Sequence, residues 1–457
     1  MRSLKYLVPL LTASLILSTH THVPAATAAE IRIDTRIDQG LQWLVSLQST
    51  SGQAYFRDPS SPSGTVNVAQ TGVAATALVM YDKTHSSDRY DVQIKNSLNF
   101  ILSMQNTTRG DFACFFDTRT GQGVSGEEMY YLNAYILEAL AFSAFQLRIA
   151  RSSTRDSAYY DTVISSVQAC FDRLQKTYQE SDGGWYYRYP GGDRDAELDA
   201  NGMTLTALLY TATYLQLWGD QSKAAQYREW AENTKDWIMS TQGTDPGSWG
   251  YGGFYQNSRR DLQDVVANAR GVFGLTTYLR LIDSLIDRST AMSRKETIRS
   301  GLVLWEESFF REISDEFRGP HQARTGQGVT AYPKSTGAAA ASMIAFVEIW
   351  VVHGDSKFLD WSKALYTWLT GENEGGVDLQ SDARSGGAGF ANGFTSPGVV
   401  DQEAGLEANA LAVSALLYGN WIDIPEFRHT SSVLTVLLAV LILVLTYRRF
   451  SCRNLRR

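Results

Sequence analysis

One helix–loop–helix unit recurs about six times between residues 38 and 420. Each unit begins with an aromatic-rich amphipathic stretch, continues through a loop rich in Gly, Tyr and Trp, and ends in an Ala-rich segment. The aromatic residues that align between units follow one another at nearly regular intervals and are Trp43, Phe100, Phe171, Trp237, Trp305 and Trp368. A repeat of this kind indicates one supersecondary unit stacked on copies of itself. Because six helical hairpins can close into a ring, we expect an all-α fold, an (α/α)6 toroid of about six hairpins.

The third unit shows the plan of a hairpin most clearly. Its first helix ends near Leu174 and Gln175, and a loop rich in Gly, Trp and Tyr follows at 182–187. A second helix begins near Glu197 and continues through small and apolar residues. Small side chains allow close helix packing, so we expect this second helix to form the inner wall of the ring.

The N-terminal segment at 1–29 has the pattern of a secretory signal peptide. Arg2 and Lys5 precede a short apolar run at 7–17, and small residues follow at 26–28. The run is short for a membrane anchor, which is the alternative interpretation.

The C-terminus carries a second apolar segment. Residues 431–447 contain no charge and are just long enough to span a bilayer, and an Arg-rich tail follows at 448–457. The positive charges predict a cytoplasmic tail and an outward-facing body at 30–420. Within the linker at 421–430, Pro425-Glu426-Phe427 resembles the three-part C-terminal sorting signals of archaeal surface proteins. The alternative is an ordinary tail anchor.

Composition limits the classes of partner. The net charge is −7 and the one dense basic cluster lies in the C-terminal tail, so nothing indicates nucleic-acid binding. Cys114 and Cys170 fall in the body, where a disulfide can persist, although the sequence does not show whether they meet. No His has ligand spacing to a Cys, so no metal site is predicted, and no cofactor motif is present.

The loops carry a family resemblance. Gln followed after a short gap by Gly and an aromatic residue occurs from Gln48, Gln105, Gln175 and Gln242. This pattern resembles the repeat of squalene cyclases and protein prenyltransferases, which are α/α toroids, as are the six-hairpin glycosidases and several polysaccharide lyases. The resemblance implies the toroid fold and does not fix the function.

The chemistry of the first two families does not carry over. The Asp-x-Asp-Asp motif of the cyclases is absent, and so is the zinc set of the prenyltransferases. The Cys-Gly-Glu-Gln thioester motif of related complement proteins is also missing.

Polar residues gather where the inner helices are expected to begin. These helix N-termini should surround a central pocket, and they favour anions. As catalytic residues we expect Asp199, Asp264 and Glu407, although a carboxylate at such a position can simply cap its helix. As substrate-binding residues we expect Asn201, Asn268, Asn409, Tyr130, Arg270, Trp185 and Trp249.

The sequence is compatible with three functions. A surface enzyme acting on a polysaccharide or surface glycan would use paired carboxylates for hydrolysis, or Tyr or His as the base of a lyase. The excess of carboxylates favours hydrolysis. A non-catalytic surface binding or structural module fits the missing motifs equally well. Terpenoid cyclisation is the third reading, and secretion argues against it.

Overall fold

The computed structural model describes residues 28–423, apart from 51–52, 60–63, 125–129, 151–155, 189–193, 283–287, 315–318, 381–388 and 397. The apolar C-terminal segment, its Arg-rich tail and nearly all of the predicted signal peptide therefore lie outside the described residues. So does the Pro-Glu-Phe tripeptide at 425–427.

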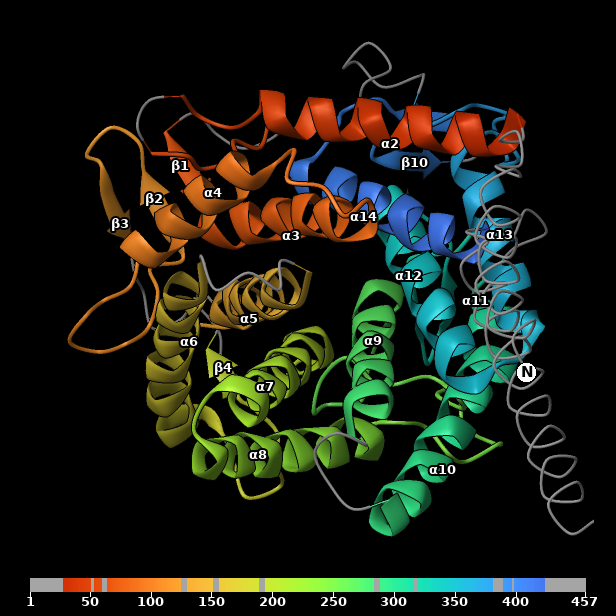
Figure 1. Ribbon diagram of the computed structural model, residues 1–457. Helices are drawn as coiled ribbons and strands as arrows, with labels where there is room; N and C mark the ends of the chain where they lie inside the picture. The colour runs from red at the N-terminus through yellow and green to blue at the C-terminus, as the bar shows by residue number, and fades with distance from the viewer. Residues whose placement is uncertain are drawn as a thin grey trace, which may run out of the picture.

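Six inner helices form a closed ring (Figure 1). Each contacts its neighbours in chain order, and the last contacts the first, as the repeat predicts. They are α3 (Val68–Thr84), α5 (Leu132–Ala150), α7 (Leu198–Trp218), α9 (Val265–Leu281), α12 (Thr336–His353) and α14 (Leu406–Asp423). A helix buried on all sides needs apolar or small side chains all round, which explains why these segments lack a polar face. Of the described helices, α12 alone is long and apolar enough to span a membrane, and 78% of it is buried within this ring.

Outer helices cover the ring and connect its inner members. They are α2 (Ala28–Ser46), α4 (Asp91–Ser103), α6 (Ser157–Tyr178), α8 (Gln221–Ser240), α10 (Arg288–Leu304) and α13 (Ser356–Leu369). Helix α10 runs on through a π-helical segment, η4 (Trp305–Phe310), into α11 (Arg311–Ile313). The protein is thus a mostly helical α/α toroid.

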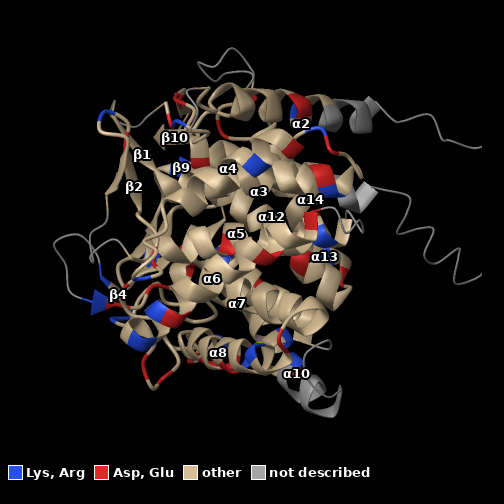
Figure 2. Cartoon of the chain, turned by 60° about the vertical axis from the view of Figure 1, so that its left-hand side comes forward, with Lys and Arg blue, Asp and Glu red and all other residues tan. Residues whose placement is uncertain are grey.

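Short antiparallel strands gather at one end of the ring (Figure 2). Three sheets each pair a strand that precedes an inner helix with a β-hairpin from the next unit. They are β1 (Thr65–Asn67) with β2 (Phe115–Asp117) and β3 (Gln122–Val124), β6 (Gln263–Asp264) with β7 (Ala323–Thr325) and β8 (Gly328–Thr330), and β9 (Lys334–Ser335) with β10 (Gly393–Ser396) and β11 (Val399–Asp401). A further pair is β4 (Tyr187–Arg188) with β5 (Arg194–Asp195). Since these strands precede inner helices, all the inner helices begin at this end, which we call the strand rim.

The glutamines of the repeated loop motif tie consecutive units together. Gln105 donates from Nε2 to the carbonyl oxygen of Ser166 in the next outer helix, over 2.8 Å. Gln242 donates in the same way to Gly301, also over 2.8 Å. In the third unit Gln179, and not Gln175, forms the β-bridge to Trp185. The motif therefore serves the scaffold.

Helices α7 and α9 approach each other through glycine. A Cβ atom on Gly202 would lie 2.6 Å from the carbonyl oxygen of Arg270, and a backbone atom there has little freedom to move. We expect Gly202→Ala to lower the free energy of unfolding by about 2 kcal/mol, because overpacking outweighs the gain in helix propensity. Gly337→Ala is the matched control, since its nearest atoms lie 3.9 Å away. It should raise that free energy by about 0.5–1 kcal/mol, as chemical denaturation will show. Equal effects of the two changes would contradict the packing argument.

Candidate active site

The asparagines predicted to bind substrate instead hold the aromatic loops. Asn268 donates from Nδ2 to the carbonyl oxygens of Phe254 and Asp264, both over 2.8 Å, and its Oδ1 accepts from the N–H of Phe254. Asn201 and Asn409 repeat this arrangement, with Trp185 and Phe390 as the clamped residues. All three are fully buried, and both amide protons of each are used. We therefore assign these amides to the scaffold.

The aromatic candidates divide between core and rim. Trp185 is fully buried, and its indole N–H donates to Thr234 over 2.9 Å, so it is a core residue. Tyr130 is also buried, and its ring packs edge-on against Tyr178 at 5.4 Å. Trp249 is half-buried and lies close to Gly326 in the turn between β7 and β8. Of the three, only Trp249 is placed to contact a ligand at the strand rim.

The carboxylate Asp199 stands at the centre of the site. It is the second residue of α7, and its Oδ1 accepts from the N–H of Ala200 over 2.8 Å. The hydroxyl of Tyr135, from α5, donates to its other oxygen. Two donors from different helices thus fix the orientation of this carboxylate.

Two further carboxyl groups beside Asp199 titrate at unusually high pH. Burial raises the pKa of Glu197 to about 7, and the negative charge of Asp199 adds to the shift. Burial likewise raises the pKa of Asp264 to about 6. Asp264 also caps α9, because its Oδ1 accepts from the N–H of Ala267 over 3.0 Å. Neighbouring carboxyl groups whose pKa values are raised by burial and by each other's charge are typical of acid–base catalytic sites.

A buried cation balances part of this negative charge. Arg270 of α9 forms an ion pair with Glu407 of α14, and its guanidinium lies 4.6 Å from the centre of the Tyr135 ring. The Glu407 side chain remains 42% exposed, which places it at the mouth of the site. The structure therefore brings Asp199, Asp264, Glu407 and Arg270 together, as the repeat positions predict.

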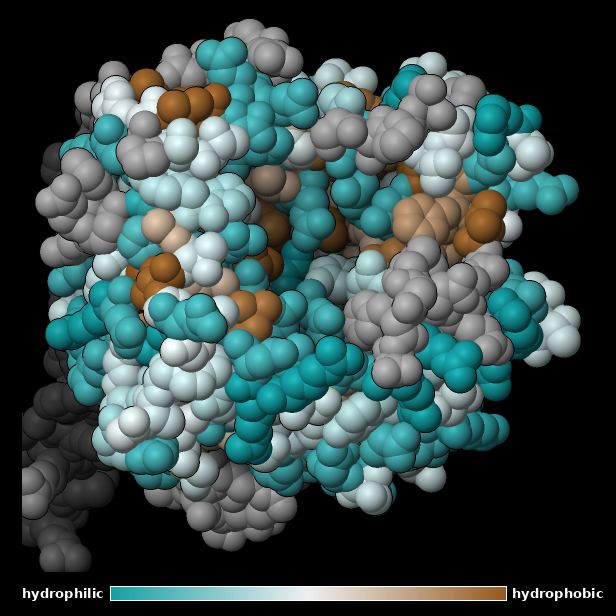
Figure 3. All heavy atoms as spheres, turned by 180° about the vertical axis from the view of Figure 1, so that it is seen from behind, coloured by the Kyte–Doolittle hydropathy of each residue, from teal (hydrophilic) through white to brown (hydrophobic). Residues whose placement is uncertain are grey.

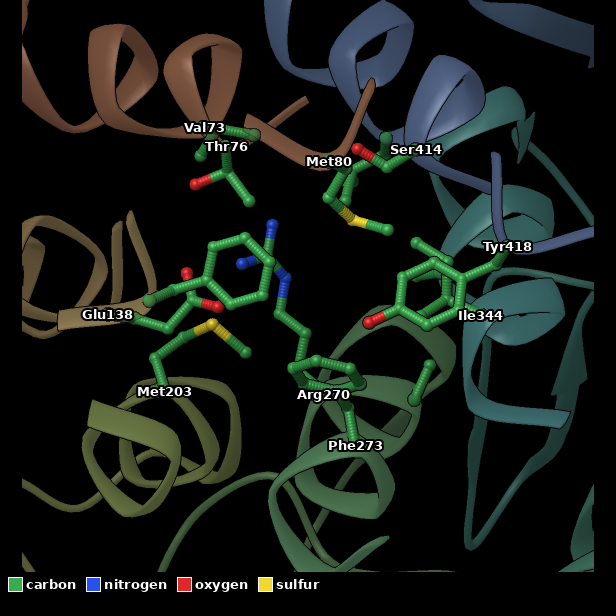
Figure 4. A pocket seen from close by; sticks show the side chains of 14 residues that line it. Val73, Thr76, Met80, Glu138, Met203, Arg270, Phe273, Ile344, Ser414 and Tyr418 are labelled. Carbon is green, nitrogen blue, oxygen red and sulfur yellow. The ribbon is translucent and has the colours of Figure 1, made fainter. Parts of the chain in front are cut away.

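A chamber lies along the ring axis, deeper than these carboxylates. Figure 4 shows side chains from all six inner helices around it, with Arg270 reaching its centre. Its volume is about 70 Å³. From behind, the strand-rim face is hollowed near its centre, and apolar residues are visible inside the hollow (Figure 3).

The sequence places Glu197 near the start of an inner helix without indicating a catalytic role, and it does not single out Tyr135 or Glu138. Burial raises the pKa of Glu138, on α5 beside Arg270, to about 7. The spacing of Tyr135 and Glu138 could have indicated that they lie together. Positions i and i+3 share a face of a helix, and in α5 this face points at the ring axis. Which face of α5 points at the axis becomes clear only when the arrangement of the six inner helices is known.

The two cysteines of the body lie on either side of Asn133 and are not bonded to each other. Asn133 contacts the sulfur of Cys114 and the sulfur of Cys170, each at 3.4 Å. Burial raises the pKa of the Cys114 thiol to about 12, which makes it a poor nucleophile. Among the described residues, no three His, Cys, Asp or Glu side chains are grouped as metal ligands.

The closed ring of six inner helices and its outer helices give this chain the fold of the six-hairpin α/α toroids. No family model and no curated protein matches the sequence. The solved structures provide the likeness, and at their low sequence identity it concerns the fold alone.

Three of these solved structures show how much of the chain the similarity covers. Cellobiose 2-epimerase from Spirochaeta thermophila has a TM-score of 0.61 at 13% identity, covering 86% of this chain and 97% of its own. D-mannose isomerase has a TM-score of 0.59 at 9% identity, covering 87% and 100%. A family 76 glycoside hydrolase, an alpha-mannanase from Bacteroides thetaiotaomicron, has a TM-score of 0.57 at 9% identity, covering 86% and 97%. These three likenesses support the six-hairpin toroid fold in the predicted resemblance, and they give no support to its squalene cyclase and prenyltransferase part.

Proposed function

We propose that this protein is a glycan-active enzyme that hydrolyses a glycosidic bond of a polysaccharide or surface glycan at the strand rim. The observation that carries the proposal is the central carboxylate cluster, in which Glu197 has a raised pKa beside the doubly hydrogen-bonded Asp199. Glycoside hydrolysis needs one carboxyl group that is protonated near neutral pH and a second that acts as a carboxylate.

The roles follow from the surroundings of each group. Glu197 donates a proton to the leaving oxygen as the bond breaks. Asp199 acts on the sugar carbon, either directly as nucleophile or by deprotonating the attacking water. Asp264 adds negative charge that favours the protonated form of Glu197. Glu407 positions Arg270, whose positive charge faces the substrate and Asp199.

The charge of the cluster favours hydrolysis over a lyase reaction. A lyase acting on a uronate must neutralise the substrate carboxylate. Here the carboxyl groups of Glu407, Asp199 and Glu138 act on Arg270, which is already paired with Glu407. The folds of the mannanase and of the sugar epimerases and isomerase agree with a carbohydrate substrate.

We further propose that the protein is held at the cell surface by residues 431–447, with its body outside. Helix α14 begins at the strand rim and ends at the opposite end of the ring, shortly before this segment. The mouth of the site would then face away from the membrane, toward extracellular glycans.

The test is hydrolysis of a panel of neutral polysaccharides, mannans and β-glucans included, followed by new reducing ends. We expect product from the wild type, and a rate lower by about 1,000-fold or more from Asp199→Asn, because that change removes the reacting carboxylate. Asp245→Asn, at an exposed loop position, is the matched control. Binding of a glycan without product from the wild type would instead establish a surface binding module.

A further inference from the structure

The central chamber is built for an apolar group and not for a sugar. Nine of its fourteen lining residues are apolar, among them Met80, Phe142, Met203, Phe273, Ile344 and Leu411. A pyranose carries several hydroxyl groups, and each must keep a hydrogen bond when it leaves water. Five lining residues carry polar groups, and two of these, Glu138 and Arg270, already interact with each other. A hydrocarbon group in this chamber would lose only contact with water.

Charged and phenolic side chains form a network at the end of the chamber remote from the strand rim. Arg280 of α9 bonds to Glu348 of α12 and to the hydroxyl of Tyr210 on α7, both over 2.8 Å. Tyr418 of α14 lines the chamber and interacts with Glu348. Burial lowers the pKa of the Lys83 ammonium on α3 to about 8, and repulsion from the nearby Arg280 contributes. Five inner helices thus contribute to one network at this end.

The entrance lies on the side of the carboxylate cluster. Arg270 lines the chamber and also pairs with Glu407 at the mouth, so one side chain borders both spaces. Its Nε–H is buried without a hydrogen-bond partner, and the buried Glu138 carboxyl stands beside it. These two groups can bind one polar atom at the junction, such as a hydroxyl oxygen of the sugar.

We propose that the substrate of this site is a glycoside with a small apolar aglycone, a short alkyl group that enters the chamber while its sugar remains at the carboxylate cluster. This inference rests on the proposed hydrolase function and adds its substrate class. The chamber places the aglycone on the axis below Arg270, so the glycosidic oxygen comes to the level of Glu197 and Asp199.

The test uses the full chain in lipid nanodiscs and titration calorimetry with methyl, propyl and pentyl glucosides and mannosides. The sugar-free alcohol 1-pentanol is a further probe, and empty nanodiscs provide the baseline. We expect the affinity of the wild type to rise about fourfold for each added carbon until the chamber is filled. Equal affinity for the three chain lengths would overturn the proposal.

Two substitutions tie that gain to the chamber. Ala341 of α12 lines it, so Ala341→Phe should fill the space and abolish the dependence on chain length while binding of the methyl glycoside is kept. Met203→Ala enlarges the chamber and should move the best chain length upward, which keeps the test valid if the larger side chain disturbs folding. Ala158→Phe, on the exposed surface of α6, is the control and should behave as wild type. A chain-length dependence that survives Ala341→Phe would also overturn the proposal.

Hydrolysis of the same glycosides is measured separately. Chain-length-dependent binding and turnover together support both proposals. A second outcome is binding that depends on chain length while no glycoside or polysaccharide is turned over. That result would support an apolar ligand in the chamber and contradict the proposed hydrolase function. Turnover that does not depend on chain length would support the proposed hydrolase function and contradict the proposal of an apolar aglycone.

Discussion

The Glu197→Gln variant should lose glycan hydrolysis by a factor of about 100 to 10,000 in kcat, the usual contribution of a general acid. Glutamine has nearly the shape of the neutral carboxyl group but no proton to give to the leaving oxygen. Binding of the glycan should change little, so the loss should appear in kcat and not in KM.

The pH profile separates an acid from a merely structural residue. In the wild type the rate should fall as pH rises through about 7, because burial and the charge of Asp199 raise the pKa of Glu197 to that value and the ionised form cannot donate. Glu197→Gln cannot donate at any pH, so its residual rate should lack this alkaline limb. Glu229→Gln, on the exposed face of α8, should keep both rate and profile. If the limb persists in Glu197→Gln, the acid is another group, and Asp264 is next in order.

The second large effect is expected on stability. Asn268→Ala should lower the free energy of unfolding by about 3 kcal/mol or more, because it leaves the backbone N–H and C=O of Phe254 and the C=O of Asp264 without their buried partner. Asn233→Ala is the control, because it deletes a side-chain amide that is exposed to solvent on α8. It should lower the free energy of unfolding by less than about 0.5 kcal/mol. Urea unfolding measured on both variants will give the difference.

The Asn268→Ala variant also shows whether the Asn268 amide holds the Phe254 loop or contacts the substrate. Below its melting temperature, Asn268→Ala should retain the KM of the wild type, since the amide faces the Phe254 loop and not the chamber. A stable Asn268→Ala protein with a raised KM would restore the substrate-binding role that the sequence suggested.

The repeat explains why so much of the architecture was predictable. A long and nearly regular period, carried by aromatic anchors, permits few folds other than a stack or ring of hairpins. The same repeat aligns Asp199, Asp264 and Glu407 at the starts of inner helices, and closure of the ring brings them together. The membrane anchor and the sorting signal remain predictions, because both lie outside the described residues.

The repeat was less informative about individual side chains. Asn201, Asn268 and Asn409 occupy equivalent positions because each clamps an equivalent loop, which is a reason of folding and not of function. Trp185 resembles a sugar-binding residue in sequence, yet its loop folds inward and buries it. Residue type and spacing in the sequence do not distinguish a role in folding from a role in substrate binding.

The sequence by itself determined a ring of helical hairpins and the rim on which its carboxylates stand, since both depend on periodicity along the chain. Only the tertiary structure decided which carboxyl groups have raised pKa values, because the pKa values of Glu197 and Asp264 depend on burial and on charges from other helices. It also decided that the centre of the ring is apolar, since the lining of that chamber comes from six helices spread along the chain from Val73 to Tyr418.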